Sequence, residues 1–324
     1  RQRQMCIRDS IVDKAGEYQK DSEKSVIVNA AGAVLKDMAV KGNLIIAEGV
    51  GSGDLTLDGV TVEGSLVLRG GGEHSVVIKG KSKLGTVLVN RRDGKLRVAV
   101  EDGAEVEIIT VEDGSDDVRI EGEVGTLIVE NTEAAVEVAG SAGKVEVPET
   151  AAGAQVKVAE GASVGTLNVA APKTNVEVSG SVSSLTVQET AEAAAVTVNA
   201  AAAVSSMTSA ADKLNVDGKG TVQNLTVTGG EGVVVSGDTK VSNVQNKGDD
   251  SILVGGEEVK PDTGSGGGGG TVTPPVTPAP TEAELKKALL DKVNSEIPGV
   301  NGVMSYAKLS AAEAQGSGYA VSVE

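Results

Sequence analysis

Few side chains in this sequence could carry out chemistry. His74 is the only histidine and Cys6 the only cysteine among 324 residues. One histidine cannot form a histidine-based metal cluster, and nothing in the sequence points to a catalytic triad around it. The surrounding stretch "RGGGEH" lacks the G-x-x-x-x-G-K-[ST] spacing of a phosphate-binding loop. We therefore expect His74 to lie exposed in a glycine-rich turn.

Two acidic stretches are the remaining candidates for chemistry: "EDGSDD" from Glu112 and "GDD" from Gly248. Carboxylates could bind calcium, and a pair converging across a cleft could hydrolyse a glycosidic bond. However, the two stretches are far apart along the chain, and residues 26 to 260 contain no aromatic side chain to hold a sugar ring. The calcium-binding repeat G-G-x-G-x-D is also absent. We interpret both stretches as solvated turns, with a weak calcium site as the alternative, and expect no catalytic, cofactor-binding or metal-binding residue.

Composition narrows the kind of core that the chain can build. The sequence has 40% hydrophobic residues but no Phe, no Trp and only three Tyr. Irregular cores usually need aromatic rings to fill odd-shaped space, whereas a stack of identical layers does not. The net charge of −17 argues against binding to nucleic acid or to anionic membrane surfaces. No apolar run reaches 18 residues, so we expect no membrane span.

Two repeating patterns, each with a period of about 20 residues, organise the chain. The first is an apolar-x-apolar triplet, and its copies begin at Leu55, Val76, Leu96, Val118, Val136, Val156, Val176, Val196, Leu214, Val233 and Ile252. The second occurs in phrases such as "GEVGTLIV" and "ASVGTLNV", and its triplets begin at Leu44, Leu66, Val87, Ile109, Leu127, Val145, Leu167, Leu185, Met207, Leu225 and Val244. Side chains alternate across a strand, so each triplet directs its two outer residues to one face. The two series predict an all-β parallel β-helix of about eleven coils.

The middle residues of the triplets predict what the outer surface carries. In the first series Arg119, Glu137, Lys157 and Glu177 alternate in charge, as a stacked ladder would favour. In the second series Ile45, Val67 and Leu88 would form an apolar outer stripe, followed by several threonines. We expect an N-terminal segment such as "AVLKDMAV" to cover this stripe as a cap. A surface for docking a partner is the alternative.

The sequence divides into four parts. We interpret residues 1–10 as derived from a sequencing adapter, because one back-translation of Met5 to Ser10 matches a transposon-end adapter; a natural basic N-terminus is the alternative. Residues 11–260 form the predicted β-helix with its cap, and residues 261–280 form a Gly/Pro/Thr linker. Residues 281–324 begin with a capping-box helix at Thr281 and continue as a hairpin. We expect this last part to be a truncated α+β domain, so that the chain is an internal fragment.

The stretch "VKGNLIIAEGVGSGDLTLDGVTVEGSLVLRGGGEHSVVI", from Val40 to Ile78, resembles a segment of large surface proteins of Gram-positive bacteria. Such proteins are typically secreted and often carry S-layer homology modules that attach them to the cell wall. The resemblance extends more weakly over residues 11 to 260, and no S-layer homology module lies in this chain. It implies a right-handed, pectate-lyase-like β-helix that serves as a stalk, an extracellular location at the cell surface, and cell-wall polymers or other surface proteins as partners.

Two functional hypotheses follow. The first is a non-catalytic structural or adhesive stalk without cofactors. The second is a carbohydrate-active lyase or hydrolase whose active residues lie outside this sequence or are unrecognised in it, since β-helices also carry such enzymes. Coils of 18 to 22 residues leave little chain for the long loops that build a substrate groove, which favours the stalk.

Overall fold

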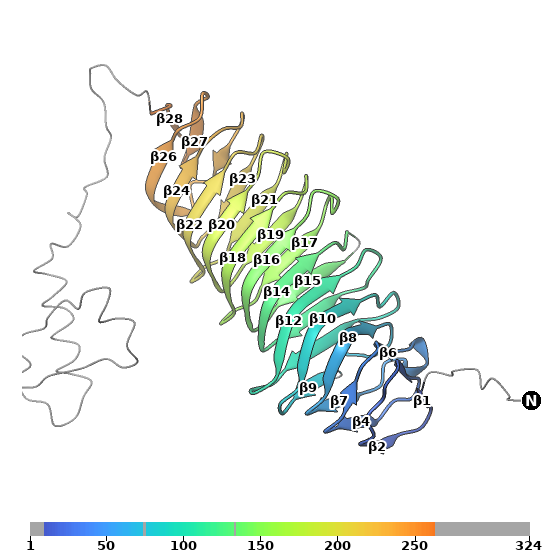
Figure 1. Cartoon of the computed structure of the whole chain (residues 1–324). Coiled ribbons are helices and arrows are strands. Elements are labelled where there is room, and N and C mark those ends of the chain that lie inside the picture. Colours follow the sequence, from blue (N-terminus) through green and yellow to red (C-terminus); the bar gives the residue numbers. More distant parts are fainter. Residues whose placement is uncertain (1–9, 74–75, 133, 263–324) are drawn as a thin grey trace, which may run out of the picture. The chain divides into compact units, whose positions relative to one another are not determined.

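A computed structural model describes residues 10–73, 76–132 and 134–262. These residues form an elongated stack of parallel β-coils of about 12 turns (Figure 1). Cys6, His74, the linker beyond Asp262 and the predicted helix and hairpin at 281–324 lie outside the described residues. The expectations for these segments therefore stay predictions.

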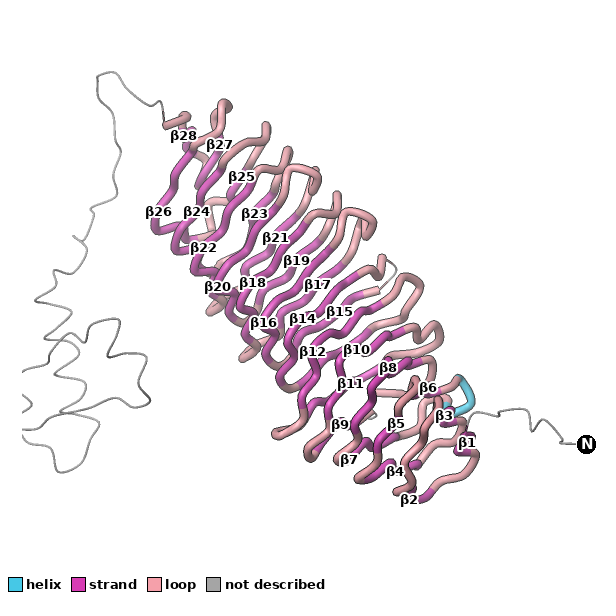
Figure 2. The backbone as a smooth tube through the Cα atoms, in the orientation of Figure 1, coloured by secondary structure: helices cyan, strands magenta, loops and turns pink. Residues whose placement is uncertain are grey.

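One face of the stack is a sheet that we name the long-strand sheet, because most of its strands have seven residues. Each strand pairs in parallel with the next along the axis (Figure 2). Its continuous order is β1 (Ser10–Val12), β3 (Val26–Val28), β6 (Leu44–Ile46), β8 (Thr61–Leu68), β10 (Lys83–Val89), β12 (Glu105–Val111), β14 (Glu123–Val129), β16 (Ser141–Val147), β18 (Ser163–Val169), β20 (Ser181–Val187), β22 (Ala203–Ser209), β24 (Thr221–Val227) and β26 (Lys240–Asn246), and β5 (Ala39–Val40) pairs with β8 off this order.

The opposite face is the short-strand sheet, whose strands have two to five residues. Its order is β2 (Gly16–Tyr18), β4 (Ala33–Lys36), β7 (Leu55–Asp58), β9 (Val77–Lys79), β11 (Leu96–Val100), β13 (Val118–Glu121), β15 (Ala135–Val138), β17 (Gln155–Val158), β19 (Asn175–Val178), β21 (Ala195–Val198), β23 (Asn215–Gly218), β25 (Val234–Val235), β27 (Ile252–Val254) and β28 (Glu257–Val259). Only β28 runs antiparallel, folding back on β27. One short 3-10 helix, η1 (Glu48–Val50), lies between β6 and β7.

The core confirms the two triplet series. Their outer residues point inward, and most stack in register, as in Val136 on Val118 and Leu127 on Ile109. The exception lies between β9 and β11, where Ile78 pairs with Val100, two residues beyond the predicted partner. Nearly all are completely buried, and only the last members, Val244 and Val254, are partly exposed. β-branched and leucine side chains pack well on such a pleated surface, and each buried one stabilises the fold by roughly 1.5–3 kcal/mol. An aliphatic core without aromatic rings is therefore sufficient for this architecture.

Turns of one type recur where the short-strand sheet leads into the long-strand sheet. Ala104, Ala162 and Ala202 each donate a backbone N–H to the carbonyl three residues earlier, at 3.1, 3.1 and 2.9 Å. The residue before each of these alanines has positive φ: Gly103 and Gly161 occupy this left-handed position at 89° and 77°. Ala201 holds the same position at φ 70°. A Cβ in this region is unfavourable, so Ala201 is a strained residue.

The segment predicted to be a cap is instead part of the stack. Residues 33–40 form β4 and β5, and β4 pairs with β2 on one side and with β7 on the other. The cap prediction is wrong because Ala33 and Leu35 follow the inward pattern of the first series, 22 residues before Leu55 and Leu57, and are completely buried. The extra coils raise the total above the eleven that the triplets suggest.

Candidate functional site

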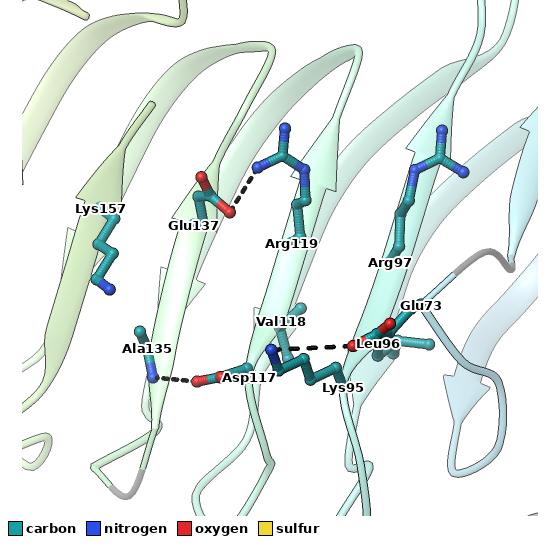
Figure 3. A pocket seen from close by; sticks show the side chains of 10 residues that line it. All are labelled: Glu73, Lys95, Leu96, Arg97, Asp117, Val118, Arg119, Ala135, Glu137 and Lys157. Atoms are coloured by element: carbon teal, nitrogen blue, oxygen red, sulfur yellow. Dashed lines mark hydrogen bonds and ion pairs between the residues drawn. The ribbon is translucent and has the colours of Figure 1, made fainter. Parts of the chain in front are cut away.

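A concave part of the described surface lies on the outside of the short-strand sheet. It is a shallow depression of about 370 Å³ over β11, β13, β15 and β17. Figure 3 shows Arg97, Arg119, Glu137 and Lys157 projecting from these four successive strands, with Glu73 and Lys95 at one side. The residues are outward because they are the middle members of their triplets. A smaller depression of about 160 Å³ continues along the same sheet around Asn175 and Glu177.

Register pairs these outward charges as the sequence predicts. Arg119 lies beside Glu137, Glu137 beside Lys157, and Lys157 beside Glu177. Arg119 Nη1 contacts Glu137 Oε2 at 2.6 Å. No ion pair to Lys157 is found among the described residues. The alternation of charge is therefore confirmed as a ladder, although only part of it closes into contacts.

Glu121 binds two neighbouring arginines of this ladder that would otherwise repel each other, an interaction that the triplets do not predict. Arg97 and Arg119 are paired in register, which places two cations side by side. Glu121, at the end of β13, accepts from both: Arg97 Nη2 lies 2.6 Å from Oε2, and Arg119 Nε lies 2.8 Å from Oε1. Sequence reasoning missed Glu121 because it lies one step beyond the triplet, in the next outward row.

The electrostatics of this network oppose a role in acid–base chemistry. The hydrogen bond from Arg97, supported by Arg119, lowers the pKa of Glu121 below its usual value. The same contacts, first with Glu121 and then with Glu137, raise the pKa of Arg119. A general acid or base works best with a pKa near the operating pH, and these shifts move both groups away from neutrality. The arrangement holds charge in place rather than transferring protons.

The acidic turn from Glu112 uses its carboxylates to connect neighbouring coils. Asp113 accepts from the Oγ1 of Thr132 at 2.6 Å and from its N–H at 3.1 Å, contacts that lower the pKa of Asp113. Asp116 accepts from the N–H of Gly94 at 2.9 Å, and Asp117 from that of Ala135 at 3.1 Å. Asp113 and Asp117 therefore satisfy donors of the following coil and Asp116 a donor of the preceding one, which supports the interpretation as a structural turn.

The structure does not bring the second acidic stretch, Gly248–Asp250, into this network. The side chain of Asn246 holds that stretch instead: it accepts from the Gly248 N–H at 3.2 Å and donates to the Asp250 carbonyl at 2.8 Å. Within the described ranges, no group of three or more His, Cys, Asp and Glu side chains could hold a metal ion. The same part of the chain contains no helix that is long and apolar enough to cross a membrane.

Arg91 is a second residue that the sequence does not single out. It lies in the turn after β10, is only 7% exposed, and its Nη2 donates to Ser52 Oγ at 3.4 Å. Its Nε is buried without a hydrogen-bond partner. Other coils place small or neutral side chains such as Ser115, Asn131 and Ala151 at buried positions of this turn. Arg91 lines neither of the two depressions described above.

The outside of the long-strand sheet carries the predicted apolar stripe. Ile45, Val67 and Leu88 are in register, and the structure extends the stripe to Ile27 and Ile11. Ile11 is 62% exposed and the other four are half-buried by their neighbours along the row. Because residues 33–40 belong to the stack, no described segment covers this stripe.

Comparisons with family models, curated proteins and solved structures give no match. The interpretation of this chain therefore depends on its own geometry.

Proposed function

We propose that the β-solenoid is a non-catalytic, load-bearing spacer within a larger secreted protein at the cell surface. The observation that carries the proposal is the uninterrupted ladder of in-register parallel strands from β1 to β26. At about 4.8 Å per strand, its thirteen consecutive strands span about 58 Å. Strand pairing joins each coil only to its neighbours, so such a stack extends by repetition.

The connections between strands support a spacer rather than an enzyme. No connection between consecutive strands from β1 to β28 exceeds eight residues, as in the segment between Leu68 and Val77. β-Helix enzymes need longer loops to wall a groove, and the depression over β11 to β17 is a shallow one lined mainly by charged side chains, of which Arg119 and Glu137 are paired. The resemblance of residues 40–78 to Gram-positive surface proteins supports the cell-surface location and wall polymers or surface proteins as partners.

Force spectroscopy tests the load-bearing role directly. The full chain, tethered at both ends, should peel coil by coil because the ladder connects each coil only to the next. Each step should release about 20 residues, which is roughly 65–70 Å of contour at about 3.3–3.6 Å per residue. A single low-force event that releases the whole stack at once would contradict a load-bearing ladder.

Two further measurements test the remaining parts of the proposal. Incubation with neutral and acidic polysaccharides should produce no new reducing ends and no unsaturated sugar products; reproducible turnover would overturn the non-catalytic assignment. The parent gene, read in genomic DNA across both ends of this sequence, should contain an export signal and wall-attachment modules. A reading frame without an export signal would contradict the surface location.

A further inference from the structure

One strip on the outside of the long-strand sheet carries little charge, although exposed Lys83, Glu105, Glu107 and Glu123 lie beside it on the same strands. Two adjacent outward rows run along it: one from Ile11 to Gln245, and one from Ser65 to Asn243. The charged members of these rows are Lys144 and Glu146, and they pair with each other at 2.5 Å. Charged residues make up 23% of the sequence and give it a net charge of −17. The face formed by these two rows, which we name the neutral face, is therefore depleted of charge.

The neutral face has an apolar half and a hydroxyl-rich half. Ile27, Ile45, Val67 and Leu88 follow one another near the N-terminal end, whereas Thr186, Thr208 and Thr226 occupy the same row further along. The four aliphatic side chains form a continuous apolar row, and such rows mark interaction sites where they are part of a larger contact surface. The hydroxyl half could remain hydrated, but it contains no charge that would oppose contact with another neutral surface.

We propose that the neutral face pairs with the neutral face of a second copy of this chain. The two solenoids would lie side by side and parallel, related by a two-fold axis along their length. Such an isologous contact places every residue of the row near its own counterpart. Ile45 then meets aliphatic side chains and Thr208 meets hydroxyl groups, whereas an antiparallel pair would place the apolar half against the hydroxyl half. The proposal is independent of the spacer function.

The area of the neutral face and its low charge both favour a second copy of this chain as the partner. The apolar stripe, over five strands about 4.8 Å apart, covers only on the order of 250 Å², which is below what a stable interface needs. The whole face, about 58 Å long and four residues wide, offers on the order of 750 Å² per copy, near the roughly 800 Å² of a standard interface. Two chains that each carry a charge of −17 can approach closely only where charge is absent. Sheets stack face to face at about 10 Å, a separation that the outward side chains of two such faces would fill.

The test is sedimentation equilibrium of the full chain together with charge variants of the row. The wild-type chain should form dimers, and Val67→Glu should weaken dimerisation at least about 100-fold, because the two-fold axis places each new carboxylate beside its counterpart. Val67→Lys should do the same, and an equimolar mixture of the two variants should form heterodimers. Thr208→Glu, in the hydroxyl half, should also weaken the dimer. Thr197→Glu, outward on the short-strand sheet, is the matched control and should leave it unchanged.

Several outcomes would overturn the proposal. A wild-type chain that is monomeric at all concentrations would leave the stripe to another protein or to a part of this chain outside the described residues. A Thr197→Glu variant that weakens the dimer as much as Val67→Glu would place the interface elsewhere. A Thr208→Glu variant with wild-type affinity would exclude the parallel pairing over the whole face. Circular dichroism of each variant verifies that the solenoid itself is intact.

Discussion

Replacing Gly140 by alanine should destabilise the solenoid by about 3 kcal/mol. Gly140 lies between β15 and β16, where one coil crosses close to the next. A Cβ at this position would come closer than 3.0 Å to the N, C and O atoms of Gly122, which are backbone atoms and cannot rotate away. Gly140 is not among the residues with positive φ, so the effect is purely steric.

The magnitude follows from the hydrogen bonds that fix the two coils. Ser141 donates its N–H to Gly122 O at 2.7 Å, and Ser163 donates to Gly140 O at 3.0 Å. Separating the coils by the distance that a methyl group needs would weaken both bonds, at about 1 kcal/mol each. Overpacking adds about 1–3 kcal/mol. Together these amount to about 3–5 kcal/mol, and because the two bonds are weakened rather than broken, we expect the lower value of about 3 kcal/mol.

Urea unfolding followed by far-ultraviolet circular dichroism measures the effect, since the chain contains no tryptophan. Gly85→Ala is the matched control: its new Cβ would meet only Glu107 Oε2, at 4.0 Å, and its φ is not positive. We expect that control to leave the free energy of unfolding unchanged or to raise it by up to about 1 kcal/mol. A Gly140→Ala protein as stable as the control would refute the argument that coil spacing is fixed at this crossing.

Three further predictions concern other parts of the stack. Ala201→Gly should raise the free energy of unfolding by about 0.5–1 kcal/mol by relieving the left-handed φ of 70°, and a loss in urea unfolding would contradict this. Leu127→Ala should lower it by about 2–5 kcal/mol through an unfilled cavity, with loss of hydrogen-exchange protection concentrated in adjacent coils. Glu121→Gln should cost roughly 1–2 kcal/mol at pH 7. Because its folded-state pKa is lowered, the contribution of Glu121 is present above its usual pKa and disappears as the pH falls through the folded value, so the mutant and the wild type should converge at acidic pH; a constant difference would refute the ion-pair account.

Much of the fold could be predicted because the apolar-x-apolar triplets identify the inward residues of each strand, and their spacing gives the length of each coil. The spacing from Val118 to Val136 and from Leu127 to Val145 gives the register directly. The same apolar-x-apolar triplet begins at Val26, 18 residues before Leu44. The period alone therefore predicts that the N-terminal segment joins the stack. The prediction of a cap at residues 33–40 does not take this period into account.

The surface was less predictable than the core. The middle residue of a triplet must point outward, which gave the order of charges from Arg119 to Glu177. Contacts between rows depend on side-chain reach, so the two arginines that share Glu121 could not be derived from register alone. The burial of Arg91 is harder to predict than these contacts, because no periodic rule says whether a residue in a turn points inward or outward.

The uniform coil also bears on how such a chain could change in evolution. Because each coil is bonded to its neighbours in the same register, a gene segment encoding about 20 residues could be duplicated or deleted by unequal recombination without disturbing the rest. Each event would change the length by about 4.8 Å, and stability would change by roughly one repeat and one interface. Length in this architecture is therefore a heritable quantity that varies in discrete steps, and relatives should differ by whole coils rather than by altered loops.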